Sequence, residues 1–270
     1  MRIPFILVAL LMSLFSLACA NLPYTDAELA GFRARNDAVE LAFTTRKGRQ
    51  VAYYLTPQGG RKVAPRPLVV SFPGIGSRAL ERLDWADKRP PAAGMLLVDY
   101  PDRGQCEGLM RPKHLPDSFV GAMEALKRES GLTEDELTAD LRIVGHSFGT
   151  AVALEFALYY PGRSVVLLAP FTTLRRAMWH RFGPLAWILP DNLHSLDMLQ
   201  RLCRMHPGVR ITIIHGTADK VIPVTMGREL RDVAPARVEL HEREGGTHTS
   251  VLGAHDLVFD ALLGGRPEAP

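Results

Sequence analysis

The stretch Leu141-Arg-Ile-Val-Gly-His-Ser-Phe-Gly149 decides the fold. The residues of Asp140–Val144 form an apolar run typical of a buried strand, and Ser147–Tyr160 has the pattern of a helix. Gly145–Gly149, where the two meet, match the pattern G-x-S-x-G. Five-residue patterns occur by chance, but a strand before and a helix after give this one its meaning. The stretch therefore predicts a sharp strand-to-helix turn with Ser147 at its apex.

Apolar runs and helical patterns alternate along the rest of the chain. Further strands are expected at Val39–Thr44, Gln50–Leu55, Pro67–Phe72, Gly94–Tyr100, Ser164–Ala169, Val209–His215 and Arg237–Glu242, and further helices at Ser77–Lys88, Asp117–Glu129, Thr225–Val233 and Ser250–Leu263. The first two strands flank Lys47-Gly48 and predict an antiparallel hairpin. Continuous apolar strands separated by helices indicate an α/β fold, a mainly parallel sheet covered on both faces. No internal repeat or linker divides the chain.

One connection is much longer than the others. About 40 residues, at about 170–208, separate two of the predicted strands, and simple strand–helix–strand connections need fewer. This insert contains Trp179, Phe182 and Trp187. It predicts a small helical cap above the ends of the strands.

Composition excludes several classes of protein. The 270 residues are 47% hydrophobic and 23% charged, which is too apolar and too balanced in charge for a disordered chain. Three cysteines are too few for a disulfide scaffold. The net charge is +3, and no arm rich in lysine or arginine occurs, so we expect no nucleic-acid partner.

Residues 1–20 have the pattern of a secretory signal peptide. Arg2 precedes an apolar run that ends at Ala18-Cys19-Ala20, and a polar segment without a basic cluster follows. We expect a signal peptide at 1–20 and an exported, periplasmic or secreted chain over 21–270. Two alternatives stay open: an uncleaved membrane anchor, and a lipoprotein signal with a lipidated Cys19, although Ser16 stands where such signals usually have leucine.

Two cysteines remain in the mature chain. In an oxidising compartment Cys106 and Cys203 can form one disulfide if they lie close enough, but two separate thiols are the favoured alternative. Neither cysteine has a partner at metal-binding spacing, so no metal site is expected.

A serine hydroxyl needs a base to act as a nucleophile, and the order Ser…Asp…His is typical of this architecture. Asp219 directly follows one predicted strand, and His248 follows the last one. Both therefore emerge at the edge of the sheet where Ser147 lies. We expect His248 to exchange the serine proton and Asp219 to orient its imidazole.

The other acids and histidines are weaker candidates. Asp191 and Asp197 lie in the insert, without a strand before them, and the patterns around His146, His241 and His255 favour structural roles.

An oxyanion site needs two N–H donors. Phe148, the residue after the serine, offers one. We expect Ile75, in the loop Ser71–Ser77, to offer the second, with Gly76 as the alternative, because Pro73 has no N–H. This chemistry needs no cofactor, and none is expected.

Together these motifs resemble the α/β-hydrolase superfamily, and more narrowly its branch of membrane-associated depalmitoylase-like and lysophospholipase-like serine hydrolases. The matching stretches are Phe72–Ser77, Val98–Gly104, Gly145–Gly149, Ala169–Thr173, Ile214–Pro223 and Gly246–His248. They extend from about residue 50 to 260. The resemblance implies an eight-stranded, mostly parallel sheet and a triad of Ser147, Asp219 and His248. Two residues depart from the family pattern: Pro73 stands where a histidine is usual, and Thr247 precedes His248.

The expected function is that of a serine hydrolase that cleaves carboxylic ester or thioester bonds through an acyl-enzyme. Lysophospholipase or lipase activity, and a noncatalytic binding module, are the alternatives. The expected partner is a small-molecule or lipid acyl ester, with association to a membrane surface possible. The insert contains six arginines and two acids. These arginines can form a basic rim around an acyl pocket, but we favour the alternative that they are solvated on the outer face of helices packed against the core.

Overall fold

The structure is a computed structural model that describes residues 22–188 and 193–264. The signal peptide expected at 1–20 and the weaker candidate Asp191 lie outside the described residues. Among the residues described, no helix combines the length and the apolar character needed to cross a bilayer.

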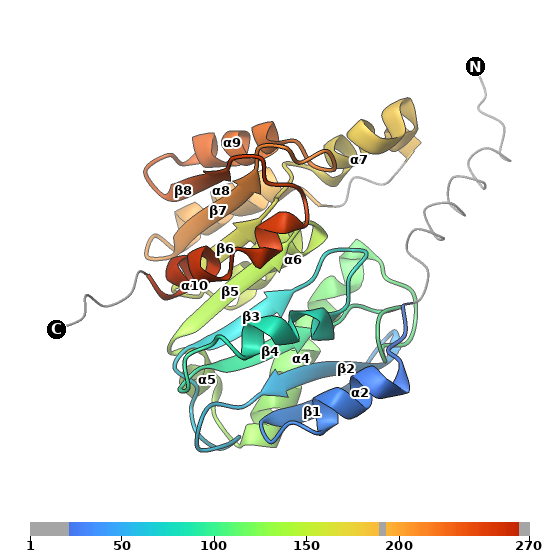
Figure 1. The fold of residues 1–270 in the computed structure, drawn as a ribbon, viewed down its shortest axis with the longest axis vertical. Coiled ribbons are helices and arrows are strands. Elements are labelled where there is room, and N and C mark those ends of the chain that lie inside the picture. Colours follow the sequence, from blue (N-terminus) through green and yellow to red (C-terminus); the bar gives the residue numbers. More distant parts are fainter. Residues whose placement is uncertain (1–21, 189–192, 265–270) are drawn as a thin grey trace, which may run out of the picture.

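One eight-stranded sheet runs through the molecule in the order β1-β2-β4-β3-β5-β6-β7-β8 (Figure 1). The strands are β1 (Ala38–Thr45), β2 (Gly48–Leu55), β3 (Leu68–Phe72), β4 (Gly94–Val98), β5 (Leu141–His146), β6 (Ser164–Leu168), β7 (Arg210–Gly216) and β8 (Val238–Arg243). Strand β2 is antiparallel to β1 and β4, and every other pair is parallel. The predicted hairpin and α/β fold are confirmed. The loops after β3 to β8 all emerge at one side, here called the carboxyl edge.

Helices cover both faces of the sheet (Figure 1). One face carries α4 (Leu115–Ser130), α6 (Phe148–Tyr159), α8 (Ser195–Met205) and α9 (Val224–Val233), and the other carries α2 (Asp26–Arg33), α3 (Leu83–Ala86) and α10 (His255–Leu263). Shorter elements are η1 (Ala79–Arg82), η2 (Pro112–His114), α5 (Glu134–Thr138) and η4 (Ser250–Gly253). Each face has its own apolar core: along β7, Ile213 belongs to one and Ile214 to the other. This alternation follows from the two-residue period of a strand.

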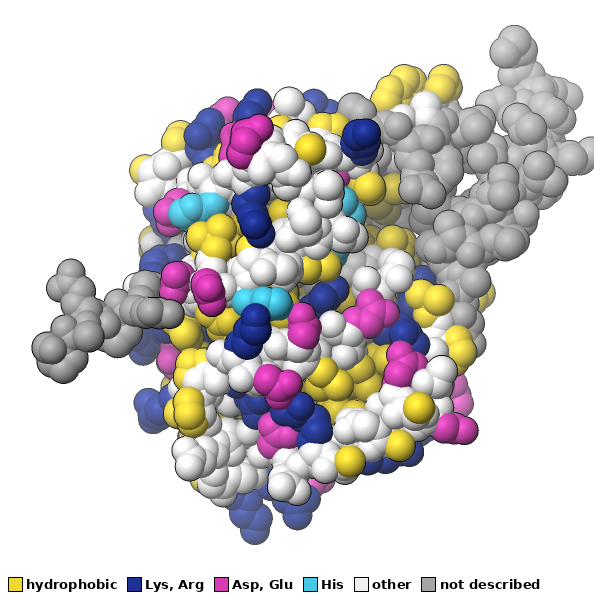
Figure 2. Space-filling view, in the orientation of Figure 1, with side chains coloured by type: hydrophobic (Ala, Val, Ile, Leu, Met, Phe, Trp, Pro, Cys, Tyr) yellow, Lys and Arg dark blue, Asp and Glu magenta, His cyan; other side chains and the backbone are white. Residues whose placement is uncertain are grey.

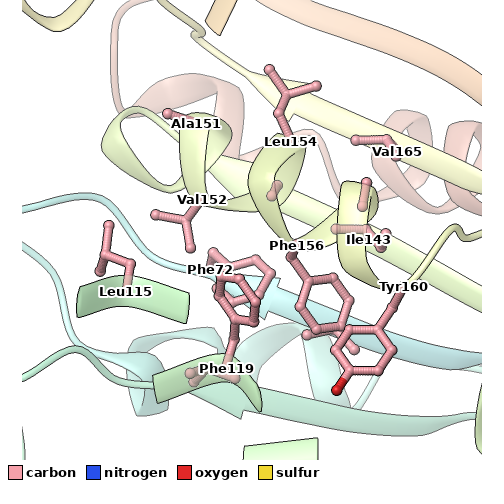
Figure 3. Close-up of a cluster of buried hydrophobic side chains, with 14 of the residues drawn as sticks. Phe72, Leu115, Phe119, Ile143, Ala151, Val152, Leu154, Phe156, Tyr160 and Val165 are labelled. Carbon is pink, nitrogen blue, oxygen red and sulfur yellow. The ribbon is translucent and has the colours of Figure 1, made fainter. Parts of the chain in front are cut away.

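Aromatic rings fill the core on the α6 face (Figure 3). The ring of Phe156 lies 5.3 Å from that of Phe72, 5.4 Å from that of Phe119 and 5.0 Å from that of Tyr160. Because α6 is enclosed by β3, β5, α4 and α8, nine of its twelve residues are buried. The helix that follows the G-x-S-x-G turn is therefore held firmly against the sheet.

The long insert between β6 and β7 contains α7 (Leu174–Phe182), η3 (Gly183–Ile188) and α8. Helix α8 packs on α6 and α9 through buried Leu199 and Leu202, while Arg201 and Arg204 are exposed. It thus packs on the helices of one face with its arginines outward, in keeping with the solvated arginines favoured above. Helix α7 begins against the core through the buried Leu174 and Ala177 and then projects outward from the molecule (Figure 1). The role of α7 and η3 as a cap stays a prediction.

Both cysteines of the described chain are free thiols. The Cys106 Sγ accepts a hydrogen bond from the Val51 N–H and donates one to the Val51 carbonyl, whereas Cys203 lies on α8.

On the face that carries α2 and α10, basic and acidic side chains are interspersed (Figure 2).

Candidate active site

Ser147 lies at a strained turn between β5 and α6. Its backbone has φ 53° and ψ −119°, a conformation that a residue with a side chain rarely adopts. The Ser147 N–H donates to the Leu168 carbonyl at 2.8 Å, so β6 holds the turn from one side. The sharp turn predicted from the sequence is present.

The two glycines of the motif allow close approach of backbones. A Cβ on Gly145 would lie 2.2 Å from the Gly149 carbonyl oxygen, and a Cβ on Gly149 would lie 2.2 Å from the Phe72 carbonyl oxygen. Any side chain at these positions would force apart β5, the start of α6 and the loop after β3. The motif therefore brings Ser147 next to that loop.

The structure brings Ser147, His248 and Asp219 together at the carboxyl edge. The Ser147 Oγ lies 2.9 Å from the His248 Nε2, and the His248 Nδ1 lies 2.8 Å from the Asp219 Oδ2. With a proton on Nδ1, His248 donates to the carboxylate and accepts from the serine hydroxyl. The three groups form one chain of hydrogen bonds along which a proton can leave the serine.

Asp219 is held as a carboxylate. Its Oδ1 accepts hydrogen bonds from the Val221 and Ile222 N–H groups at 2.8 and 2.9 Å. Burial by itself would raise its pKa, but hydrogen bonds from His215, His248 and the Ile222 N–H outweigh burial and hold the pKa well below its usual value. The acid therefore stays charged throughout the physiological pH range.

Backbone bonds join the loops that carry Asp219 and His248. The Ala218 N–H donates to the Gly246 carbonyl and the Thr217 N–H to the Arg243 carbonyl, both at 2.9 Å. A Cβ on Gly216 would lie 2.1 Å from the Gly246 carbonyl oxygen, so this contact requires glycine. The distance between Asp219 and His248 is set by the backbone of two neighbouring strands.

His146, immediately before the serine, contacts the backbone of the histidine loop. Its Nε2 donates to the His248 carbonyl at 2.9 Å, and the two rings lie 4.9 Å apart. Burial lowers the pKa of His146 to about 3, so its ring is neutral. The structural role expected of His146 thus has a specific form, and its partner, a backbone carbonyl 102 residues away, carries no signal in the sequence.

The loop after β3 lies beside the serine. A Cβ on Gly74 would be 3.2 Å from the His146 Nδ1 and 3.5 Å from the Ser147 Cβ. Phe148 begins α6, and its ring packs edge-on against Tyr100. Both segments named as sources of oxyanion donors, the Ile75 loop and Phe148, therefore adjoin the nucleophile.

The weaker candidates have other partners. Asp197 is exposed in the first turn of α8, His241 lies beside Glu239 on β8, and His255 lies beside Asp84. Over 22–188 and 193–264, no group of three or more His, Cys, Asp or Glu side chains is arranged to hold a metal ion.

Comparison with known proteins finds similarity to esterases. A profile of the family described as "Putative esterase" matches residues 131–261. An uncharacterized protein of Mycobacterium tuberculosis is 30% identical over 138 residues, which is 50% of this chain and 46% of that protein. The chain thus spans about half the length of this Mycobacterium tuberculosis relative. Human alpha/beta hydrolase domain-containing protein 17B is 25% identical over 227 residues, 80% of this chain and 71% of that one.

Solved structures share the fold. The Pyrococcus furiosus esterase Pf2001 has a TM-score of 0.63 at 14% sequence identity. The match covers 91% of this chain and 93% of that one. The 2,6-dihydroxy-pseudo-oxynicotine hydrolase has a TM-score of 0.65 at 17% identity, with coverage of 90% and 73%. XC6422 from Xanthomonas campestris, described as an a/b serine hydrolase without lid, has a TM-score of 0.57 at 13% identity, and the match covers 87% of this chain and 98% of that one. At these identities the likeness concerns the fold alone.

Proposed function

Because this chain belongs to the α/β-hydrolase superfamily, we propose that it is a serine hydrolase that cleaves carboxylic ester or thioester bonds through an acyl-enzyme. The observation that carries the proposal is the continuous hydrogen-bonded chain from the Ser147 Oγ through His248 to Asp219. A fold hosts many functions, so the argument rests on this site rather than on the architecture.

In the proposed reaction, the Ser147 Oγ attacks the carbonyl carbon of the ester while the His248 Nε2 takes the hydroxyl proton. The carbonyl π electrons move onto oxygen, which the Phe148 and Ile75 N–H groups would stabilise. Collapse of this adduct expels the alcohol or thiol, which receives the proton from His248. Water, activated by the same imidazole, then releases the carboxylic acid and restores the serine.

Asp219 stabilises the imidazolium formed at both steps. Its lowered pKa means that it offers a full negative charge to the His248 Nδ1–H. A noncatalytic binding module would have no need for such an arrangement, which favours the enzyme over that alternative.

Active-site labelling tests the proposal. A fluorophosphonate should label the wild type, and p-nitrophenyl esters should be hydrolysed, while Ser147→Ala should lose both properties. Ser118→Ala, which removes another buried hydroxyl on α4, is the matched control and should keep both. An unlabelled wild type, or equal turnover by wild type and Ser147→Ala, would reject the proposal.

Substrate class needs a separate measurement. We propose that p-nitrophenyl esters and acyl thioesters are turned over faster than lysophospholipids of matched acyl chain, in keeping with the ester or thioester hydrolysis proposed above. Faster release of fatty acid from the lysophospholipid would instead support the lysophospholipase alternative.

We also propose that residues 1–20 direct export. N-terminal sequencing of protein recovered from a secreting bacterial host should show a chain that begins near residue 21. An intact Met1 in the membrane fraction would contradict cleavage.

A further inference from the structure

We propose that Tyr100 and Arg103, on the loop after β4, are positioning residues that hold the oxyanion loop Pro73–Gly76 in its active conformation. The inference rests on the proposed function and deepens it, because it names groups that act on the reaction without touching the substrate. Both side chains are 1% exposed, and both reach across to backbone carbonyls of the loop.

Arg103 holds the carbonyl of Ile75. Its Nε and Nη2 both donate to the Ile75 oxygen, at 3.1 and 2.9 Å, and its Nη1 donates to the Asp102 carbonyl at 2.6 Å. A buried guanidinium that directs two donors at one carbonyl fixes that carbonyl in direction as well as in position. The Ile75 carbonyl shares its peptide unit with the N–H of Gly76, the alternative to Ile75 as the second oxyanion donor.

Tyr100 holds the carbonyl two residues earlier. Its hydroxyl donates to the Pro73 oxygen at 2.8 Å, while its ring packs against Phe148, the other expected donor residue. Between these two anchors, the Ser77 N–H donates to the Gly74 oxygen at 3.1 Å. Three consecutive peptide carbonyls, those of residues 73, 74 and 75, are therefore each held by a different donor.

Holding the carbonyls sets the direction of the N–H groups. A trans peptide unit is planar, so its C=O and N–H point in opposite directions. The Ile75 carbonyl, held by Arg103, thereby fixes the Gly76 N–H, the alternative oxyanion donor, and the Pro73 carbonyl, held by Tyr100, fixes the Gly74 N–H. The Ile75 N–H shares its peptide unit with the Gly74 carbonyl, which the Ser77 N–H holds between these two anchors. Because Gly74 and Gly76 allow wide rotation, this loop can turn its peptide units at little cost unless they are anchored. Anchored donors need no reorganisation when the negative charge develops, which is the source of oxyanion stabilisation.

The loop that carries the two anchors is itself fixed. The buried Asp99 accepts hydrogen bonds from the Ala79 N–H at 2.7 Å and the Tyr24 hydroxyl at 2.9 Å. The Gly104 N–H donates to the Leu22 carbonyl at 2.9 Å, and a Cβ on Gly104 would lie 2.4 Å from the Asp99 Oδ2. Tyr100 and Arg103 thus extend from a rigid support.

The test compares variants that remove these donors with controls that remove similar groups elsewhere. Arg103→Met and Tyr100→Phe remove the donors and keep much of the buried volume. Arg237→Met is the first control, because Arg237 also donates to backbone carbonyls, those of His206 and Val209, at the opposite edge of the sheet. Tyr54→Phe is the second, because the buried Tyr54 hydroxyl has no hydrogen-bond partner among the described residues.

Each variant is assayed for kcat and KM with a p-nitrophenyl ester and for inhibition by an alkylboronic acid, which forms a tetrahedral adduct with a catalytic serine. For Arg103→Met we expect kcat to fall about 10–100-fold, less than the loss of an oxyanion donor, with KM changed less than about threefold. The boronic acid should bind more weakly by about the same factor as kcat falls. Tyr100→Phe should show the same pattern at about 3–10-fold.

Equal kcat within about twofold for wild type and both folded variants would overturn the inference, and so would a loss confined to KM with unchanged boronic acid affinity. If Arg103→Met fails to fold, Tyr100→Phe decides. An inactive wild type, or an active Ser147→Ala, would reject the proposed function and this inference with it. An active wild type, an inactive Ser147→Ala and unaffected Tyr100 and Arg103 variants would reject the positioning roles alone.

Discussion

At Asp219, two backbone N–H groups hold Oδ1 and leave Oδ2 to face the His248 Nδ1. Asp219→Asn presents an amide in place of this acceptor and removes the charge that, in the proposed reaction, stabilises the imidazolium. We expect kcat to fall by about 10³–10⁴-fold with little change in KM, as the wrong tautomer of the base becomes favoured. Steady-state kinetics with a p-nitrophenyl ester measures the change.

Asp197→Asn is the matched control. Asp197, on α8 between β6 and β7, was a weaker candidate for the acid, and its side chain is exposed. Its variant should keep kcat within about twofold of wild type, since isolated surface charges contribute little. Comparable losses in both variants would contradict the assignment of Asp219.

His146 makes stability depend on pH. Its pKa is lowered from 6.5 to about 3 by burial, so on acidification the unfolded chain takes up a proton that the folded chain refuses. The contribution of neutral His146 is complete above pH 6.5 and is lost as the pH falls toward 3. His146→Gln, which keeps an N–H donor but does not titrate, should lose less stability than wild type on acidification.

Urea unfolding at pH 7.5 and 4.5 checks this expectation. The decrease in unfolding free energy between the two pH values should be smaller in His146→Gln by about 2–3 kcal/mol at most, because each pH unit below the unfolded pKa corresponds to about 1.4 kcal/mol. Parallel pH dependence of the two proteins would show that His146 is protonated in the folded state.

Among the elements, β7 and β8 set the spacing of acid and base through their loops. Gly216→Ala places a methyl group against the Gly246 carbonyl and forces the two loops apart. We expect a loss of about 1–3 kcal/mol in unfolding free energy. We also expect kcat to fall by more than the unfolded fraction of the variant can account for. Thermal unfolding and kinetics at a temperature where the variant is fully folded separate the two effects.

Gly31→Ala provides the comparison for Gly216→Ala. Gly31 lies within α2, and a Cβ there meets no atom within 4 Å. Its variant should be more stable by about 0.5–1 kcal/mol, because alanine loses less backbone entropy than glycine in a helix. Similar effects at both positions would contradict the contact between the β7 and β8 loops.

Elements with strong apolar patterns were predictable, and those held by long-range polar contacts were not. The strands β3 to β8 match apolar runs, but a single helix was expected at 77–88, where the chain forms η1 followed by α3. There the Ala79 N–H donates to the Asp99 carboxylate and the Leu80 N–H to the Tyr24 hydroxyl. These long-range contacts hold the start of the segment in place of a regular helix. Helix α2 was missed, although Thr25 and Glu28 form a capping box that the sequence could have revealed.

The candidate site shows the same division. Ser147, Asp219 and His248 each follow a recognisable strand, so their meeting at the carboxyl edge could be expected from topology. The contacts of Tyr100, Arg103 and His146 are with backbone carbonyls of remote loops. Every residue has a carbonyl, so no residue type marks the partner, and only the three-dimensional arrangement reveals it.

For the molecule as a whole, the sheet separates two apolar cores that share its strands. Val152 on α6 packs in one core, and Val258 on α10 packs in the other. Both side chains are at most 1% exposed. The two residues belong to different clusters on opposite faces of the sheet. A substitution in one core should therefore change the packing of the other core only if the sheet itself moves.

A double-mutant cycle measures that coupling. Val152→Ala and Val258→Ala should each lower the unfolding free energy by about 1.5–3 kcal/mol, the loss of two buried carbons plus a cavity. Because the sheet is close-packed on both faces and holds its register through backbone hydrogen bonds, the double variant should show the sum within about 0.5 kcal/mol. An interaction free energy above about 1 kcal/mol would mean that the strands shift when either core loosens. The loops that carry Ser147, Asp219 and His248, which extend from those strands, would then respond to packing on both faces.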